Sequence, residues 1–121
     1  MCSSDLCRLE PALIVAKRQS LLAALEAGVT LCNGSDVGVF PHGENVRELE
    51  LLVDYGVPVV EVLRAATSVT ARVLHLDDQV GQVRAGLLAD LIAVEGNPLE
   101  SISALRAVRF VMQNGRIIRQ P

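Results

Sequence analysis

The chain has 121 residues, which is the usual length of one domain, and half of its residues are hydrophobic. Aromatic residues make up only 2% and tryptophan is absent, so any core must be built from aliphatic side chains. The net charge is -3, and the sequence has neither a Lys/Arg cluster nor an aromatic platform, which argues against a nucleic-acid-binding protein. No apolar run is long enough to cross a bilayer, which argues against a membrane protein.

The three cysteines, Cys2, Cys7 and Cys32, are odd in number and irregularly spaced, which argues against a disulfide framework. Cys32 falls in a predicted apolar strand, where we expect a small buried hydrophobic side chain. A reducing cytoplasm fits this cysteine usage. A secreted or periplasmic parent protein stays open, because its signal peptide would precede the present sequence.

The first six residues differ in character from the rest of the chain, and they resemble the translation of a sequencing-adapter end. We therefore expect residues 1–6 to be a non-native leader, with the native sequence beginning near Cys7. The alternative is an ordinary polar N-terminus in which Ser3, Ser4 or Asp5 caps a helix.

The pattern from 8 to 27 predicts a helix, with Gly28 at the position where the backbone turns out of it. The β-rich run 29–32 then predicts a buried strand. A Gly-rich loop from 34 to 43 comes next, and it is the expected place for chemistry because loops after strands carry functional groups.

Two further helices are predicted after this loop. One begins at Glu44 or Asn45 and ends at Gly56, and the other runs from about Pro58 to Leu76. After residue 78 the spacing of the apolar residues changes from that of a helix to that of extended chain.

The extended part predicts strands at 80–83 and 91–94 and a short helical turn near Ile102. Asn114-Gly115, flanked by apolar runs, predicts a hairpin with a type I′ turn. Asp90 is expected to stabilise a turn, and His75 to end the third predicted helix without a catalytic role.

Several segments in order resemble the C-terminal part of the metal-dependent amidohydrolase superfamily. They are residues 28–36, His42-Gly43-Glu44-Asn45 with Arg47-Glu48-Leu49, Ala65-Ala66-Thr67, Val80-Gly81-Gln82-Val83, Ala89-Asp90-Leu91, Asn97-Pro98-Leu99 and Asn114-Gly115-Arg116. The histidine-containing stretch is most similar to the prolidase-like and imidazolonepropionase-like branch.

The resemblance implies an α/β fold, in which the chain forms the C-terminal portion of a (β/α)8 TIM barrel plus part of a small composite β-sandwich. Residues 7–76 would be the last helix-strand-helix units of the barrel, and residues 77–121 the C-terminal strands of the β-sandwich. The implied cofactor is one or two divalent metal ions, most commonly zinc.

The resemblance also assigns residues to the site. Asp36 matches the family's metal-binding aspartate of the last barrel strand, and a carboxylate there suits both a metal and proton transfer from an attacking water. From its spacing alone, Asp36 would be better explained as a residue that caps a turn through its side chain. His42 is a candidate contact to the substrate, although a structural histidine in this loop is as well supported. A helix start and its solvated face are the expected positions of Glu44, Glu48 and Glu50. Glu48 could also support the loop beneath the site.

The predicted function is therefore hydrolysis of a C–N bond (amide, cyclic amide or dipeptide) by a metal-dependent parent enzyme. That enzyme is expected to act on small-molecule or dipeptide-like substrates and to form a homo-oligomer. His42 and His75 are the chain's only histidines, and they do not form the family's His-x-His pair. We therefore expect this chain to be inactive alone. The alternative is a non-catalytic partner-binding module or one chain of a split enzyme, which would need another chain to cover its apolar faces.

Overall fold

The computed structural model describes residues 11–38 and 40–121 of the chain. The chain divides into two compact units, one ending at Thr30 and the other beginning at Leu31. Helices and a small antiparallel sheet are both present, so the predicted mixed α/β class is confirmed at that level. No helix in the described ranges is both long and apolar enough to cross a membrane.

The described part of the first unit contains helix α1, Ala12–Glu26. The helix is preceded by Pro11 and ends in a Schellman motif, in which Gly28 N–H donates to Leu25 O and Val29 N–H donates to Ala24 O, both at 2.9 Å. Gly28 has a φ of 79°, so the sequence correctly identified it as the residue that ends the helix. The predicted helix start at residue 8 and the leader 1–6 lie outside the described residues.

The predicted buried strand at 29–32 is not formed. The backbone from 31 to 36 belongs to no helix or strand, and within the described residues its one hydrogen bond to the backbone of a helix runs from Asn33 N–H to Ala65 O at 3.3 Å. A strand needs a neighbouring strand to pair with it, and no described segment pairs with this one. Cys32 is consequently an exposed free thiol, not the buried side chain that was expected.

Three helices follow in the second unit: α2 (Val46–Asp54), α3 (Val59–Ala65) and α4 (Ser68–Val73). The single helix expected from about 58 to 76 is therefore wrong, because it breaks at Ala66–Thr67. Thr67 leaves helical geometry (φ -133°, ψ -95°), and its hydroxyl donates to Leu63 O at 2.7 Å. Short hydroxyl side chains compete in this way for the carbonyls of a helix, which explains the break.

The segment between α4 and the sheet is built from turns, so the strand predicted at 80–83 is also wrong. Gln79 N–H and Val80 N–H both donate to Leu76 O at 2.9 Å, which curls the chain back. Gly81 then packs against the start of α4 with a φ of 93°. This conformation is unlike that of a strand.

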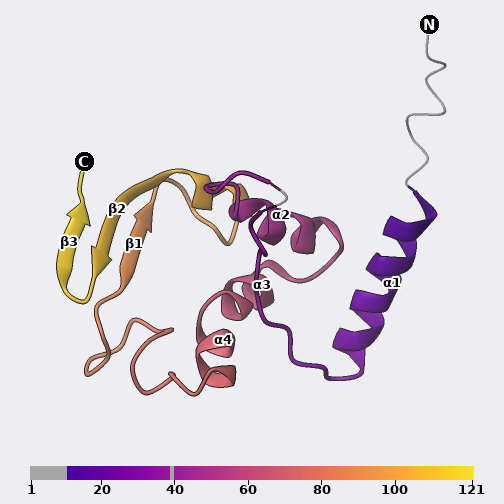
Figure 1. Cartoon of the computed structure of the whole chain (residues 1–121), viewed down its shortest axis with the longest axis horizontal. Coiled ribbons are helices and arrows are strands. Elements are labelled where there is room, and N and C mark those ends of the chain that lie inside the picture. Colours follow the sequence, from indigo (N-terminus) through magenta and orange to yellow (C-terminus); the bar gives the residue numbers. More distant parts are fainter. Residues whose placement is uncertain (1–10, 39) are drawn as a thin grey trace, which may run out of the picture. The chain divides into compact units, whose positions relative to one another are not determined.

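The sheet has three strands in the order β1 (Leu91–Val94), β2 (Val108–Gln113) and β3 (Arg116–Arg119), all antiparallel (Figure 1). A short 3₁₀ helix, η2 (Ile102–Arg106), connects β1 to β2. The predicted strand 91–94, the helical turn near Ile102 and the hairpin are confirmed.

Asn114 and Gly115 form the hairpin turn between β2 and β3, with φ values of 48° and 73°. Both are positive, as a type I′ turn requires. Asp90, immediately before β1, stabilises this turn, because its Oδ1 accepts a 2.6 Å hydrogen bond from Asn114 N–H. The expectation that Asp90 supports a turn is confirmed, although the turn lies 24 residues further along the chain.

The core of the second unit lies among its helices. The buried side chains of the described residues are Leu49, Val57, Val62, Ala65, Ala71 and Ile102. All are aliphatic, as the composition predicted, and they come from α2, α3, α4, η2 and the α2–α3 turn. The strands contribute no buried side chain, so the helices provide the rigid base beside which the candidate site is placed.

Candidate functional site

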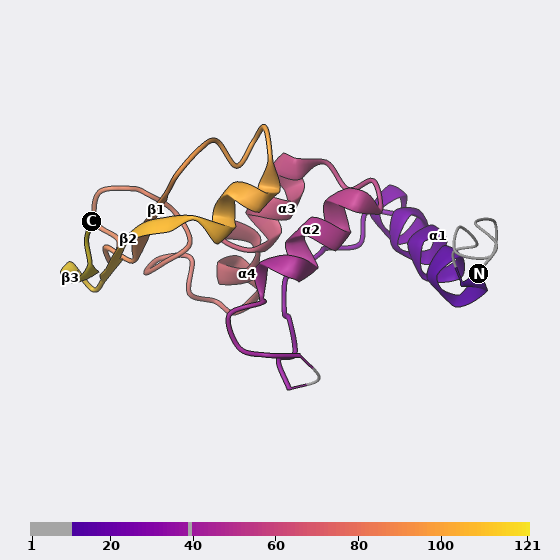
Figure 2. The same ribbon diagram turned by 90° about the horizontal axis from the view of Figure 1, so that it is seen from above.

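The loop that leads into α2 carries both residues that the sequence singled out, Asp36 and His42. Figure 2 shows this loop extending away from α2, α3 and α4. Asp36 is exposed and has a φ of 46°, a left-handed conformation that is uncommon for a residue other than glycine. His42 is exposed as well. Both side chains are therefore available to groups outside the described residues.

Glu48, on the first turn of α2, holds the N-terminal end of this loop. Its Oε2 accepts a 2.6 Å hydrogen bond from Asn33 Nδ2, and its Oε1 lies 3.5 Å from the donating Gly34 N–H. The Asn33–Glu48 bond is partly buried and joins residues 15 positions apart. Glu48 is thus not part of a solvated face, and the expectation that it could support the loop is confirmed.

A second connection joins the loop to the start of α2. Asn45 Nδ2 donates to Ser35 Oγ at 2.8 Å, and Asn45 Oδ1 accepts from Gly43 N–H at 3.2 Å. Asn45 forms no side-chain capping bond to α2. Asn45 and Ser35 are 10 positions apart in the chain, so their spacing did not reveal the contact.

An open pocket of about 490 Å³ adjoins the loop. It is lined by Gly34, Ser35, Phe40, Glu44, Arg47, Glu48 and Leu51. The residues immediately before Asp36 therefore form part of its wall, while neither Asp36 nor His42 is among the described residues that line it.

A network of charges fastens the other side of α2 to η2. Arg106 donates from Nε to Glu50 Oε1 at 2.8 Å, from Nη2 to Glu50 Oε2 at 2.9 Å, and from Nη1 to Glu44 Oε2 at 2.8 Å. Ser103 Oγ donates to the same Glu50 Oε1 at 2.7 Å. The two-pronged bond from Arg106, with help from Ser103, lowers the pKa of Glu50 from 4.5 to about 2.

The expectation that Glu50, the partner of Arg106, lies on a solvated face is therefore wrong. Only 12% of the Glu50 side chain is exposed, and both residues belong to one network. Their separation of 56 residues explains why sequence spacing could not show the contact.

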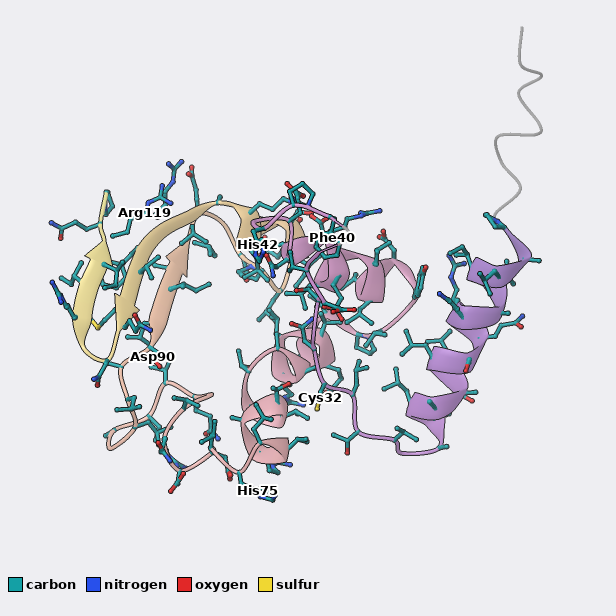
Figure 3. All side chains as sticks on the ribbon, in the orientation of Figure 1. Cys32, Phe40, His42, His75, Asp90 and Arg119 are labelled. Atoms are coloured by element: carbon teal, nitrogen blue, oxygen red, sulfur yellow. The ribbon has the colours of Figure 1, made fainter. Side chains whose placement is uncertain are left out.

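Figure 3 places the other singled-out residues. His42 and Phe40 lie on the loop near α2, whereas His75 lies at the far end of α4. His75 has a φ of 57° and its N–H donates to Arg72 O at 3.1 Å, so it ends the helix, as expected. The structure thus brings Asp36 and His42 onto one loop and keeps His75 away from it.

The described residues do not by themselves fit a metal ion. A catalytic zinc site takes three protein ligands, usually His, Cys, Asp or Glu. No group of three such side chains able to hold a metal occurs in residues 11–38 and 40–121. Asp36 can be at most one ligand of a site completed from elsewhere.

Among proteins of known sequence, the ochratoxinase of Aspergillus niger is 36% identical over 105 residues, which cover 81% of this chain and 21% of that enzyme. The chain thus spans about a fifth of the length of this curated relative. Several solved structures also match this chain. A Xaa-Pro dipeptidase with bound methionine in its active site matches with a TM-score of 0.81 and 39% identity, over 84% of this chain and 25% of that protein.

A prolidase complexed with N-methylphosphonate-L-proline matches with a TM-score of 0.79 and 31% identity, over 86% of this chain and 26% of that protein. The A. niger ochratoxinase structure matches with a TM-score of 0.76 and 33% identity, over 86% of this chain and 25% of that protein. The model of the amidohydrolase family matches residues 1–118, nearly the whole sequence. The chain therefore belongs to the amidohydrolase family.

Proposed function

We propose that this chain is a C-terminal segment of a metal-dependent hydrolase that cleaves C–N bonds in amides, cyclic amides or dipeptides. The observation that carries the proposal is the family match over residues 1–118, together with the 39% identity to a Xaa-Pro dipeptidase. The resemblance of segments 28–36 and 42–49 to the end of the family's TIM barrel supports the proposed placement within the parent enzyme.

In this proposal Asp36 supplies one carboxylate ligand to a divalent metal, most simply zinc, and the other ligands come from the rest of the enzyme. Its exposed position on a loop held by α2 supports this role. His42, exposed on the same loop, is proposed to contact the substrate. Because the described residues do not hold a metal, the chain alone is proposed to be inactive.

The test is an assay of the protein encoded by the whole reading frame that contains this chain. Xaa-Pro dipeptides and N-acyl amino acids are supplied as substrates with added zinc, and the released amino acid is measured. We expect hydrolysis by this protein and none by the 121-residue chain assayed alone. If the protein from the whole reading frame releases no amino acid from any of them, the proposal fails.

The role of Asp36 is tested by Asp36→Asn in the same protein. Loss of a group that serves both metal binding and proton transfer is expected to lower kcat by roughly 10²-fold or more, and to lower the bound zinc measured by elemental analysis. The matched control is Asp77→Asn, which alters an exposed aspartate in the turn after α4 and should change neither value. Full activity and zinc content in Asp36→Asn would remove Asp36 from the site.

A further inference from the structure

We infer that Glu48 is a positioning residue, which fixes the backbone that presents Asp36; the inference rests on the proposed function. Glu48 touches neither Asp36 nor any reacting group in the described residues. It acts through Asn33 and Gly34, which lie three and two positions before Asp36 in the chain.

Glu48 holds the segment before Asp36 through both of its carboxylate oxygens. One carboxylate oxygen of Glu48 accepts from the Asn33 side chain at 2.6 Å, and the other faces the Gly34 N–H at 3.5 Å. The backbone N–H of Asn33 donates to Ala65 O at 3.3 Å, at the end of α3. Asn33 is therefore held by α2 through its side chain and by α3 through its backbone.

The helix that carries Glu48 is fixed against the core. Glu48 is followed by Leu49, one of the few buried side chains in the described chain, so α2 cannot shift without disturbing the core. Asn45, at the start of the same helix, holds Ser35 at 2.8 Å. The three residues before Asp36 are thus each bound to groups on α2 or immediately before it.

The backbone of Asp36 itself needs such support. A non-glycine residue with a φ of 46° costs free energy, and such a conformation persists only where its surroundings hold it. No regular strand supports the segment 31–36, so these hydrogen bonds replace the support that a sheet would give. Glu48 is the one charged group among them, and charge-assisted hydrogen bonds are the stronger kind.

The expected effect rests on the sensitivity of active sites to small displacements. A displacement of about 1 Å can cost about 10²-fold in rate, and loss of a residue that orients a metal ligand costs about 10- to 100-fold. In the protein from the whole reading frame, Glu48→Ala should therefore lower kcat by about 10- to 100-fold. KM should change less than kcat, because no substrate contact is assigned to Glu48.

An exchange of donor and acceptor gives the sharpest test. Asn33→Asp alone places two carboxylates at the position of a 2.6 Å hydrogen bond, and it should lower kcat strongly. Glu48→Gln alone should have a milder effect, because the Asn33 amide can flip and restore one bond. In the double variant N33D/E48Q the introduced amide donates to the introduced carboxylate, so kcat should recover well above that of Asn33→Asp.

The matched control is Glu50→Gln, the same change two residues further along α2, where the partners are Arg106 and Ser103. It should leave kcat near the wild-type value even if it lowers the melting temperature. A readout independent of activity is hydrogen exchange in the peptide spanning residues 31–38. Exchange there should speed up in Glu48→Ala and stay unchanged in Glu50→Gln.

The outcomes separate the two proposals. An inactive wild-type protein would overturn the proposed function, whereas an active wild type with unchanged kcat in Glu48→Ala would overturn only the positioning role. Should Glu48→Ala fail to fold, the comparison of the double variant N33D/E48Q with Asn33→Asp decides. A double variant no more active than Asn33→Asp would contradict the inference. Recovery of kcat, together with hydrogen exchange at residues 31–38 that is slower than in Asn33→Asp, would support it.

Discussion

Glu48 and Glu50 lie two residues apart on α2, yet they serve different neighbours. Residues at this spacing point to different sides of a helix. Glu48 binds the loop before Asp36, while Glu50 binds Arg106 and Ser103 on η2. The helix is thereby held between the candidate site on one side and the connection to the sheet on the other.

The Glu50–Arg106 pair makes the stability of this unit sensitive to acid. The pKa of Glu50 is lowered to about 2 in the folded chain from an ordinary value of 4.5, so the folded state favours the ionised carboxylate. The resulting stabilisation is fully present above pH 4.5 and is lost as the pH falls from there toward 2. Urea unfolding followed by circular dichroism should show the free energy of unfolding declining across this window.

Glu50→Gln should remove that contribution. Because Arg106 is partly open to solvent, we expect a loss of only about 1 kcal/mol at pH 7, and a flatter pH profile below 4.5. Glu61→Gln is the matched control, since its pair with Arg64 is exposed on both sides and should contribute little. Equal pH profiles for wild type and Glu50→Gln would contradict this account of the pair.

The turn at Gly81 fixes how the segment after α4 lies against that helix. A Cβ added at Gly81 would meet Ala71 Cβ at 2.5 Å and Thr67 O at 3.2 Å, and the φ of 93° is strained for any other residue. Gly81→Ala should therefore lower the free energy of unfolding by about 2 to 4 kcal/mol, measured by urea unfolding.

Gly86→Ala separates strain from crowding in that prediction. Gly86 has nearly the same φ, 94°, but nothing lies within 4 Å of its Cβ position. It should cost only about 1 kcal/mol, from the backbone conformation alone. Equal losses in the two variants would mean that the turn at Gly81 does not press against α4.

The elements that sequence patterns predicted correctly are those whose signals are local. The end of α1 depends on Gly28, and the hairpin depends on Asn114 and Gly115, all of which adopt positive φ. The strands expected at 29–32 and 80–83 are absent because strand formation depends on pairing partners, which the local pattern does not reveal. The break near Thr67 was missed for a related reason, since its cause is a side-chain bond to Leu63 O and not an apolar periodicity.

The candidate site was predictable only in part for the same physical reason. A loop rich in glycine, with Asp36 and His42 on it, could be read directly from the sequence. The bonds that hold this loop, Asn33 to Glu48 and Asn45 to Ser35, join residues 15 and 10 positions apart. No helical or strand period links such positions, so the sequence pattern does not reveal these bonds and only the folded structure shows them.

The second unit leaves much apolar surface uncovered. Val83 is 88% exposed, and Ile92, Ile117 and Ile118 of the sheet are between 49% and 58% exposed. An open hollow of about 470 Å³ beside the sheet is lined mainly by Leu91, Ile92, Val111, Met112 and Ile118, with Asp90 and Gln113. Apolar surface of this kind marks a place where other protein normally packs.

The 121-residue chain expressed alone should therefore self-associate. Size-exclusion chromatography with light scattering should give a mass well above the 13.0 kDa of the monomer. Ile118→Lys places a charge on the hollow and on the edge strand β3, where charges oppose pairing between chains, so it should shift the population toward monomer. Gln120→Lys adds the same charge beyond the strand and should leave the mass unchanged. A monodisperse wild-type monomer would show instead that the exposed apolar side chains are too dispersed to drive association.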